Sequence, residues 1–335
     1  MKGGRFQAPA TWFGRREADC AGYINSRSSK TIYQRASVSV DQVKRACRAT
    51  MVAIALMVLP PRFVAAITAI RLHQSRRDLK EALREALGRD VALVEPGPVP
   101  PPELIAATSL MSKSDLQLKS QKHVYLAHSY RSAAWILNMA RAAGLTFREG
   151  MSIFELGCGE GRLISHLRAL PRARLVASDV RADTIKWCRN SLPGIEFHVN
   201  ELEPPVAFLE SNSVDLAIAQ SVFTHIPLAW QRAWLEETAR VIRPGGIFWC
   251  TIIGQHHIDV MLDKDARQIL EETGEFELDG KDPRSSYSTQ LIGSWDVFQT
   301  EPVVRREFGR YFEIANYQKN PAGPDVLVMR VPPLG

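Results

Sequence analysis

Glycine and acidic residues alternate in a short segment whose backbone could bind a small ligand. The segment ELGCGEG holds Glu155, Gly157, Gly159 and Gly161 and directly follows an apolar run. Glycine has no Cβ, so the backbone at such a turn can approach a ligand closely. A carboxylate beside the turn repels a pyrophosphate but favours an ammonium or sulfonium group. The GxGxG spacing also departs from the GxGxxG of dinucleotide-binding turns, so the segment predicts a site for a cationic ligand.

Two further groups of polar residues follow the next apolar runs. Asp179 ends the run ARLVAS, twenty residues beyond Gly159, where a carboxylate can accept both hydroxyls of a ribose. The alternative is that Asp179 caps a helix that begins near Arg181. Asn200 and Glu201 follow the third run, where the edge of an adenine would lie, although loop residues of these types are often only solvated.

The elements that position these residues alternate between strands and helices. Such alternation is typical of a mostly parallel sheet covered on both faces. Two late runs, which open at residues 310–312 and at Val326, predict an antiparallel hairpin at the sheet edge. We therefore expect an α/β, Rossmann-like fold. The predicted strands are 151–156, 173–178, 195–199, 214–219 and 246–252, and the predicted helices are 160–170, 181–191 and 228–242.

Charge and proline content divide the chain. Residues 1–90 hold 17 basic and 7 acidic side chains, whereas residues 91–335 hold 25 and 29, so the larger part lacks the basic excess of a nucleic-acid-binding protein. No nucleic-acid partner is expected. The pattern predicts a disordered segment at residues 1–50 and a helical, apolar and basic extension at residues 51–91. A Pro-rich linker is predicted at residues 92–104 and the main domain at residues 105–335.

The extension has two interpretations. A helix from Ser75 to Gly88 would place Leu79, Ala82 and Leu83 on one face, and this face could pack on the protein's own domain. Alternatively, residues 51–89 could contact an anionic membrane surface. The apolar run that begins at Met51 is interrupted by prolines, so no transmembrane helix is predicted. Five scattered cysteines without CxxC spacing predict a cytoplasmic setting, membrane-peripheral if that contact forms.

Four segments together resemble the class I S-adenosylmethionine-dependent methyltransferases. They are ELGCGEGR, VASD, SVDLAIAQSVFTHIP and ETARVIRPGGIFWCT, within a likeness that covers roughly residues 125–332. The resemblance implies a seven-stranded sheet and S-adenosylmethionine as cofactor. It also implies that Glu155 and the three glycines line the methionine end, Asp179 holds the ribose and Asn200 and Glu201 flank adenine, while Gln220 and Ser221 close the pocket. The family usually has Asp near position 200, so the sequence departs there.

The resemblance implies methyl transfer by in-line displacement, with an oxygen of a small molecule or saccharide as the expected acceptor. If the acceptor is an alcohol, His225 is the predicted general base; the alternative is a histidine that caps the helix starting near Leu228. Residues 280–300 would form either a lid over the acceptor or an ordinary surface loop. No metal site is predicted, because the adjacent His256 and His257 on an extended segment would point to opposite faces.

Two other classes of function stay open on the sequence. A nicotinamide-dependent oxidoreductase could use the same fold, but it should show GxGxxG and a catalytic Tyr or Lys, and the GxGxG turn with Glu155 argues against it. A non-catalytic binding or scaffold protein, anchored at a membrane surface through residues 51–89, would keep the fold but would not need a cofactor pocket, and the intact cofactor motif argues against this class.

Overall fold

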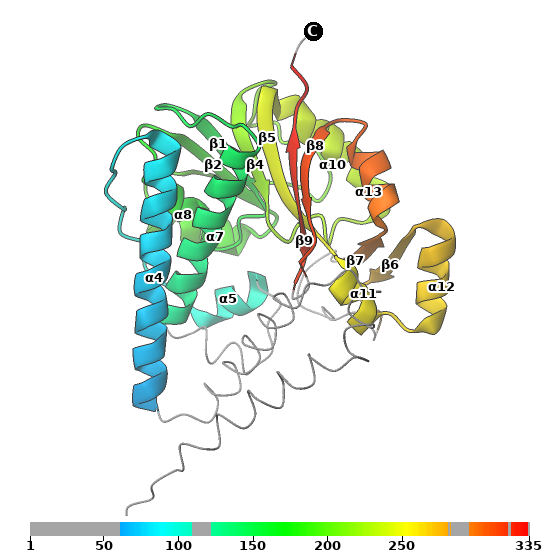
Figure 1. The fold of residues 1–335 in the computed structure, drawn as a ribbon, viewed down its shortest axis with the longest axis horizontal. Coiled ribbons are helices and arrows are strands. Elements are labelled where there is room, and N and C mark those ends of the chain that lie inside the picture. The colour runs from blue at the N-terminus through cyan, green and yellow to red at the C-terminus, as the bar shows by residue number, and fades with distance from the viewer. Residues whose placement is uncertain (1–60, 109–121, 281, 283–294, 321–322, 334–335) are drawn as a thin grey trace, which may run out of the picture. The chain divides into compact units, whose positions relative to one another are not determined.

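A computed structural model of the chain describes residues 61–108, 122–280, 282, 295–320 and 323–333 (Figure 1). Pro60 to Gly335 form one compact unit. The disorder predicted for residues 1–50 lies outside the described residues, as does the first part of the predicted extension.

A seven-stranded sheet in the order β3-β2-β1-β4-β5-β9-β8 forms the centre of this unit. The first five strands pair in parallel, and β9 pairs antiparallel with both β5 and β8. The expected mostly parallel sheet and its C-terminal antiparallel hairpin are thus confirmed. The strands are β1 Ser152–Leu156, β2 Arg174–Asp179, β3 Glu196–Val199, β4 Val214–Ala219, β5 Ile242–Ile252, β8 Glu313–Gln318 and β9 Asp325–Arg330.

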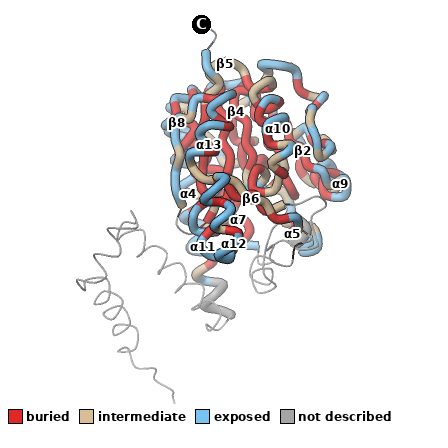
Figure 2. Tube along the Cα trace, turned by 90° about the vertical axis from the view of Figure 1, so that its right-hand side faces the viewer, coloured by how far each residue is buried: buried red, intermediate tan, exposed pale blue. Residues whose placement is uncertain are grey.

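The apolar strands form because helices cover the sheet on both faces, so side chains on both faces are buried. Successive residues of β1 point to opposite faces: Ile153 belongs to the core on one side and Phe154 to the core on the other. Figure 2 shows the buried strands surrounded by more exposed helices. The helices are α4 Pro61–Leu87, α5 Pro102–Thr108, α7 Lys122–Ala142, α8 Ile164–Leu167, α9 Ala182–Ser191, α10 Leu228–Val241 and α13 Glu301–Phe308.

Two predicted boundaries were wrong. Residues 160–170 hold only the four-residue helix α8, because the glycine-containing turn continues to Leu163 before a helical hydrogen-bond pattern begins. Strand β5 starts at Ile242 rather than at residue 246, so the RPGG segment lies within the strand, next to an irregularity in its pairing with β4.

Helix α4 packs along α7 within this unit (Figure 1). Leu79, Ala82 and Leu83 are buried in the same core as the inner face of α7, as the packing interpretation of this helix requires. The predicted start at Ser75 was wrong, because the described helix already runs from Pro61 and Ser75 is buried within it.

The Pro-rich segment also packs against the unit. Val94 and Val99 contact the core that α4 and α7 share, and Arg168 donates a hydrogen bond to the carbonyl of Glu95 (3.0 Å). The segment predicted as a linker at residues 92–104 therefore does not separate two compact units. The remaining domain boundaries stay predictions.

A small second sheet lies between β5 and α13 in the chain. Strands β6 Glu275–Asp279 and β7 Trp295–Gln299 pair antiparallel, and we call this pair the β6–β7 ribbon. Together with α11 Gln255–Met261 and α12 Lys264–Thr273 it contributes to a separate apolar cluster. His256 and His257 lie in α11, so the extended conformation expected for them was wrong. Most of the predicted lid at residues 280–300 lies outside the described residues.

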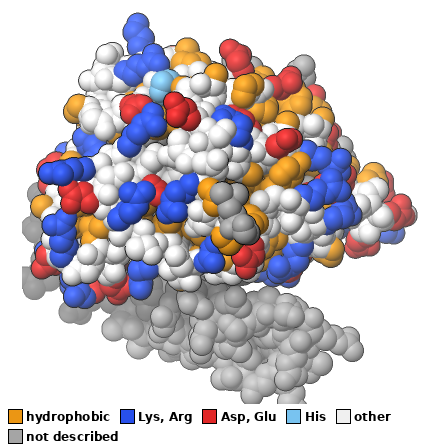
Figure 3. All heavy atoms as spheres, turned by 90° about the horizontal axis from the view of Figure 1, so that it is seen from above, with side chains coloured by type: hydrophobic (Ala, Val, Ile, Leu, Met, Phe, Trp, Pro, Cys, Tyr) orange, Lys and Arg blue, Asp and Glu red, His pale blue; other side chains and the backbone are white. Residues whose placement is uncertain are grey.

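Basic and acidic side chains lie beside one another on the face shown in Figure 3. Ion pairs among the described residues include Arg174 with Glu196 (2.9 Å) and Arg232 with Glu307 (3.0 Å). Within the part of the chain that the structure describes, no helix is long and apolar enough to cross a membrane.

Candidate functional site

The glycine-containing turn between β1 and α8, residues 157–163, is tied to the end of β2 by two hydrogen bonds. We call it the cofactor turn. Gly159 N–H donates to Asp179 Oδ2 (2.8 Å), and Cys158 N–H donates to the carbonyl of Ser178 (2.9 Å). Gly157, Gly159 and Gly161 all have positive φ angles, which explains why this turn requires glycine. The sequence therefore correctly predicts that Asp179 and the glycines lie together.

Asp179 holds backbone groups on both sides of its strand end. Besides Gly159, it accepts a hydrogen bond from Arg181 N–H through Oδ1 (3.0 Å), although no side-chain cap of α9 forms. Burial raises the pKa of Asp179, and the two backbone hydrogen bonds oppose that shift. Each carboxylate oxygen can accept more than one hydrogen bond, so both can still accept a ligand hydroxyl.

Glu155 points into the protein rather than along the turn. Its side chain accepts a hydrogen bond from Ile164 N–H (3.0 Å), and the residue is only 3% exposed. Burial raises its pKa to about 8. Glu155 therefore braces the junction between the turn and α8, and a contact with the methionine end of a cofactor stays a prediction.

Asn200 lies directly beside Asp179, because its N–H donates to the Asp179 carbonyl (3.2 Å). Its Nδ2 donates to the carbonyl of Glu201 (2.7 Å), whereas the buried Oδ1 has no hydrogen-bond partner among the described residues. Glu201 itself is exposed. A buried acceptor without a donor is costly, so Oδ1 is suited to accept from a bound ligand.

The segment after β4, residues 220–228, contacts the cofactor turn. We call it the post-β4 segment. The side chain of Val222 lies where a Cβ on Gly157 would be, so glycine is required here for close approach as well as for its positive φ. Gln220 is partly buried, and Ser221 adopts a positive φ while its N–H donates to Thr251 Oγ1 (2.7 Å). Thr251 was not identified from the sequence, where no local signal distinguishes it from the rest of β5.

His225 lies in the turn that follows Val222. Its Nδ1 is 2.8 Å from the carbonyl of Trp295, which fixes the tautomer with hydrogen on Nδ1 and the lone pair on Nε2. The carboxylate of Asp296, which is completely buried, lies 3.9 Å from Nδ1. Burial lowers the pKa of His225 to about 4, so the ring is neutral near pH 7.

The β6–β7 ribbon fixes the backbone around His225. Val297 N–H donates to the Thr224 carbonyl (3.1 Å), and Trp295 N–H donates to the His225 carbonyl (3.3 Å). At the start of α10, Leu228 N–H donates to Glu277 Oε2 (2.8 Å). The predicted helix-capping role of His225 is thus filled in part by Glu277. Sequence reasoning missed these partners because they lie about 50 to 70 residues away.

The arrangement fits an adenosine-containing ligand. Asp179 offers acceptors for ribose hydroxyls, and Asn200 Oδ1 offers an acceptor for an adenine amino group, beside a turn whose glycines permit close approach. Among the described residues, no group of three or more His, Cys, Asp and Glu side chains is placed to hold a metal ion.

Comparisons with known proteins agree with this geometry. Residues 153–246 match the family model described as a methyltransferase domain. The malonyl-[acyl-carrier protein] O-methyltransferase of Hahella chejuensis is 32% identical over 155 residues, which are 42% of this chain and 53% of that protein. A probable phthiotriol/phenolphthiotriol dimycocerosates methyltransferase of Mycobacterium ulcerans is 36% identical over 103 residues, 30% of this chain and 38% of that protein.

A third relative, the fatty-acid O-methyltransferase of Mycolicibacterium smegmatis, is 32% identical over 106 residues, 31% of this chain and 37% of that protein. The chain thus spans about half or less of the length of these relatives. The match includes the cofactor turn, the ends of β2 and β3, and the post-β4 segment. The chain therefore carries a domain of the class I S-adenosylmethionine-dependent methyltransferase family, whose cofactor is S-adenosylmethionine.

Proposed function

We propose that this protein transfers a methyl group from S-adenosylmethionine to an oxygen of a small-molecule acceptor. The observation that carries the proposal is the hydrogen bond from Gly159 N–H to Asp179, with Asn200 beside it. These residues are the proposed ribose and adenine contacts. Gly157 and Gly161 line the turn, while Gln220 and Ser221 lie directly after β4 and would close the cofactor pocket.

The bound cofactor supplies an electrophilic methyl group on a sulfonium leaving group. The protein's task is to align the acceptor oxygen with that methyl group and to exclude water. Asp179 and Asn200 would fix the adenosine, and the cofactor turn would fix the rest of the cofactor. The post-β4 segment would then present the acceptor, because Val222 already contacts Gly157.

We propose that His225 accepts the proton when the acceptor is a hydroxyl. The Trp295 carbonyl holds hydrogen on Nδ1, so Nε2 is the atom that would take the proton. A pKa of about 4 keeps the ring unprotonated but makes it a weak base, so its contribution is expected to be modest. A carboxylate acceptor would not need this base.

The names of the relatives support an oxygen acceptor that belongs to an acyl or lipid group. Two of the three relatives described above are named O-methyltransferases, one for malonyl-[acyl-carrier protein] and one for fatty acids. The third is named for a dimycocerosate lipid. A saccharide acceptor stays within the proposal, and a membrane-surface contact through residues 51–89 stays a prediction.

The proposal is tested by incubating the purified protein with S-adenosylmethionine and a panel of fatty acids, small hydroxylated molecules and saccharides. Formation of S-adenosylhomocysteine together with a methyl ester or methyl ether, in equal amounts, is the expected result. Cofactor binding without methylation of any oxygen acceptor in the panel would contradict the acceptor class. The variant His225→Ala distinguishes methylation of a hydroxyl from methylation of a carboxylate. The rate of methyl transfer to a carboxylate should be insensitive to this substitution.

A further inference from the structure

The carboxylate of Asp296 lies on an apolar face of the β6–β7 ribbon. Asp296 is directly opposite Leu278 on β6, and alternation along β7 puts it on the same face as Phe298. Leu278 and Phe298 both belong to the separate apolar cluster, and Asp296 itself is completely buried. A carboxylate in such surroundings lowers stability unless charges or hydrogen bonds compensate for its burial. The contacts of this carboxylate therefore bear on its role.

One of these contacts is the ring of His225. Asp296 Oδ1 lies 3.9 Å from His225 Nδ1, and the carbonyl oxygen of Trp295 lies 2.8 Å from the same nitrogen. Two consecutive residues of β7 thus place acceptor oxygens near Nδ1. Both oxygens favour hydrogen on Nδ1, which leaves the lone pair on Nε2. The carboxylate adds a negative charge, whereas the carbonyl adds only a dipole.

Backbone hydrogen bonds on both sides of Asp296 hold its side chain near this ring. Before it in the chain, Trp295 N–H donates to the His225 carbonyl (3.3 Å). After it, Val297 N–H donates to the Thr224 carbonyl (3.1 Å). Because both neighbours of Asp296 are bonded to the post-β4 segment, the carboxylate keeps its place beside the ring as long as this pairing persists.

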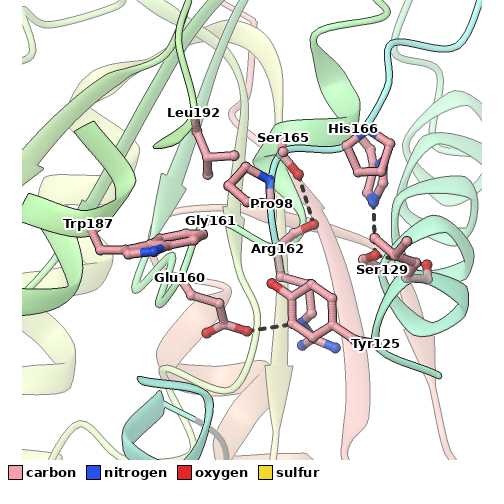
Figure 4. Close-up of a pocket in the computed structure, with 13 residues that line it drawn as sticks. Pro98, Tyr125, Ser129, Glu160, Gly161, Arg162, Ser165, His166, Trp187 and Leu192 are labelled. Carbon is pink, nitrogen blue, oxygen red and sulfur yellow. Dashed lines mark hydrogen bonds and ion pairs between the residues drawn. The ribbon is translucent and has the colours of Figure 1, made fainter. Parts of the chain in front are cut away.

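A second histidine with little exposure, His166, has different surroundings (Figure 4). Its Nε2 lies 2.8 Å from Ser129 Oγ, and the Ser129 hydroxyl donates to the carbonyl of Leu126 (2.8 Å), so Nε2 of this ring carries the hydrogen. Burial and three nearby arginines lower the pKa of His166 to about 3. The charges that act on His166 are therefore positive, whereas the charged group beside Nδ1 of His225 is a carboxylate.

Proton transfer to His225 would create a positive charge on a largely buried ring. Burial opposes this charge and lowers the pKa of His225 to about 4. A negative charge within about 4–6 Å favours the protonated form of a histidine, and Asp296 Oδ1 lies at 3.9 Å from Nδ1. A charge that develops during a reaction is stabilised best by groups that are already in place, as the backbone pairing of β7 ensures here.

We propose that Asp296 stabilises the protonated ring of His225 that forms when Nε2 accepts the proton of a hydroxyl acceptor. The O–H bond breaks as the oxygen takes the methyl group, the proton goes to Nε2, and Nδ1 keeps its own hydrogen. Asp296 takes no proton and acts through the ring, so it is a positioning residue. The inference rests on the proposed function, because it requires His225 to be the proton acceptor.

The test measures methyl transfer by the wild type, Asp296→Asn, His225→Ala and the variant with both substitutions. Asparagine keeps the shape of the Asp296 side chain and removes its charge. Each protein is assayed at saturating S-adenosylmethionine with the hydroxyl and the carboxylate acceptor that the wild type methylates fastest in the panel described above. Glu275→Gln is the matched control, because it removes a carboxyl group from the other end of the same ribbon, opposite Gln299.

Asp296→Asn is expected to lower kcat for the hydroxyl acceptor about tenfold, and by no more than His225→Ala does. The KM for S-adenosylmethionine and the rate with the carboxylate acceptor should not change. In the His225→Ala background the same substitution should have no further effect, because the charge that it removes acts through the ring. Glu275→Gln should leave all rates within about twofold.

Three outcomes of these assays would overturn the proposal. The first is no change in kcat for Asp296→Asn. The second is an equal loss with hydroxyl and carboxylate acceptors, and the third is the same fold loss with and without His225. The last two would assign Asp296 to the folding of the ribbon alone. The comparison with and without His225 decides the question by itself if no carboxylate is methylated.

A measurement on the wild type covers the case in which Asp296→Asn does not fold. Nuclear magnetic resonance of protein with ¹⁵N-labelled histidine and ¹³C-labelled aspartate reports which nitrogen of His225 carries hydrogen and whether Asp296 is ionised near pH 7. The proposal requires hydrogen on Nδ1 and an ionised Asp296. Hydrogen on Nε2, or a protonated Asp296, would overturn it.

The same assays separate this inference from the proposed function. If the wild type methylates no oxygen acceptor, the proposed function fails and the inference fails with it. If the wild type methylates only carboxylates, methyl transfer to oxygen stands, but the role of His225 and the inference fail. If His225→Ala slows methylation of a hydroxyl and Asp296→Asn does not, only the inference fails.

Discussion

The cofactor turn and the post-β4 segment are held in place in different ways. The cofactor turn is fixed by the strand that follows it in the same βαβ unit, through Asp179, which is 20 residues from Gly159. The post-β4 segment is fixed by the β6–β7 ribbon, about 70 residues further along the chain, and by Thr251. One region depends on a local motif, whereas the other depends on an insertion that folds back on it.

This difference predicts that substitutions in one region affect cofactor binding, whereas substitutions in the other affect the rate of methyl transfer. Changes in the cofactor turn and its partner Asp179 should act on cofactor affinity. Changes around His225 should act on the rate of methyl transfer with the cofactor still bound. The contact between Val222 and Gly157 is where the two effects should mix.

The largest expected effect is that of Asp179→Ala on cofactor affinity. The substitution removes the acceptor for Gly159 N–H and the proposed acceptors for two ribose hydroxyls. We expect the dissociation constant for S-adenosylmethionine to rise about 100-fold, since hydrogen bonds to a charged group contribute about 1.5–3 kcal/mol each. Calorimetric titration measures this change.

Asp183→Ala is the matched control for that titration. Asp183 is an exposed carboxylate in the first turn of α9 and pairs with Arg181. Its removal should leave cofactor affinity within about twofold, as is usual for an exposed ion pair. Equal losses in the two variants would assign the effect to net charge rather than to the Asp179 contact.

The next effect concerns turnover. His225→Ala should lower kcat with a hydroxyl acceptor by about 10- to 100-fold, at or below the lower end of general-base effects, because the low pKa of the ring limits its strength as a base. Cofactor affinity should not change. Single-turnover rates at saturating substrate measure this, and His256→Ala in α11 is the control; an unchanged rate would leave His225 with a structural role.

Much of the first region, but little of the second, could be predicted from the sequence. The glycines, Asp179 and Asn200 follow consecutive strands, and the ends of parallel strands meet at one edge of the sheet, so local patterns place them together. Trp295, Asp296 and Glu277 belong to a ribbon whose docking depends on long-range backbone pairing. No local pattern indicates that pairing.

Residue type alone indicates neither the orientation of a side chain nor the packing of a segment. Glu155 has the residue type and position expected for a ligand contact, but residue type does not show which way a side chain turns. Ile164 N–H takes its carboxylate inward. Similarly, the Pro-rich segment has the composition of a linker, and only the structure shows that Val94 and Val99 pack against the core.

The contact between the two regions can be tested by a double-mutant cycle. Gly157→Ala should weaken the cofactor about tenfold, because a Cβ would collide with Val222 and alanine is strained at a φ of 67°. Adding Val222→Ala should recover part of that loss. Gly150 also has a positive φ, but a Cβ added there would meet no other atom, so Gly150→Ala measures the effect of backbone strain alone. Strict additivity would show that the regions are independent.

The smallest effect is a change in the pH dependence of stability. The folded-state pKa of Glu155, about 8, lies above its ordinary value, so the folded protein holds a proton that the unfolded chain releases. This contribution to stability is complete below about pH 4.5 and is lost as pH rises towards 8.

Glu155→Gln should therefore gain stability relative to the wild type as pH rises from 5 to 9. Thermal unfolding at several pH values measures the difference, which we expect to reach a few degrees, and Glu203→Gln, which removes an exposed carboxyl, is the control. A constant difference across this range would show that the carboxyl is not protonated in the folded protein.

The central claim is that the cofactor turn and Asp179 bind S-adenosylmethionine. It is tested most directly by calorimetric titration of the wild-type protein with S-adenosylmethionine and, in parallel, with NAD. The account predicts one site with micromolar affinity for S-adenosylmethionine and no detectable binding of NAD. Binding of NAD without binding of S-adenosylmethionine would contradict it.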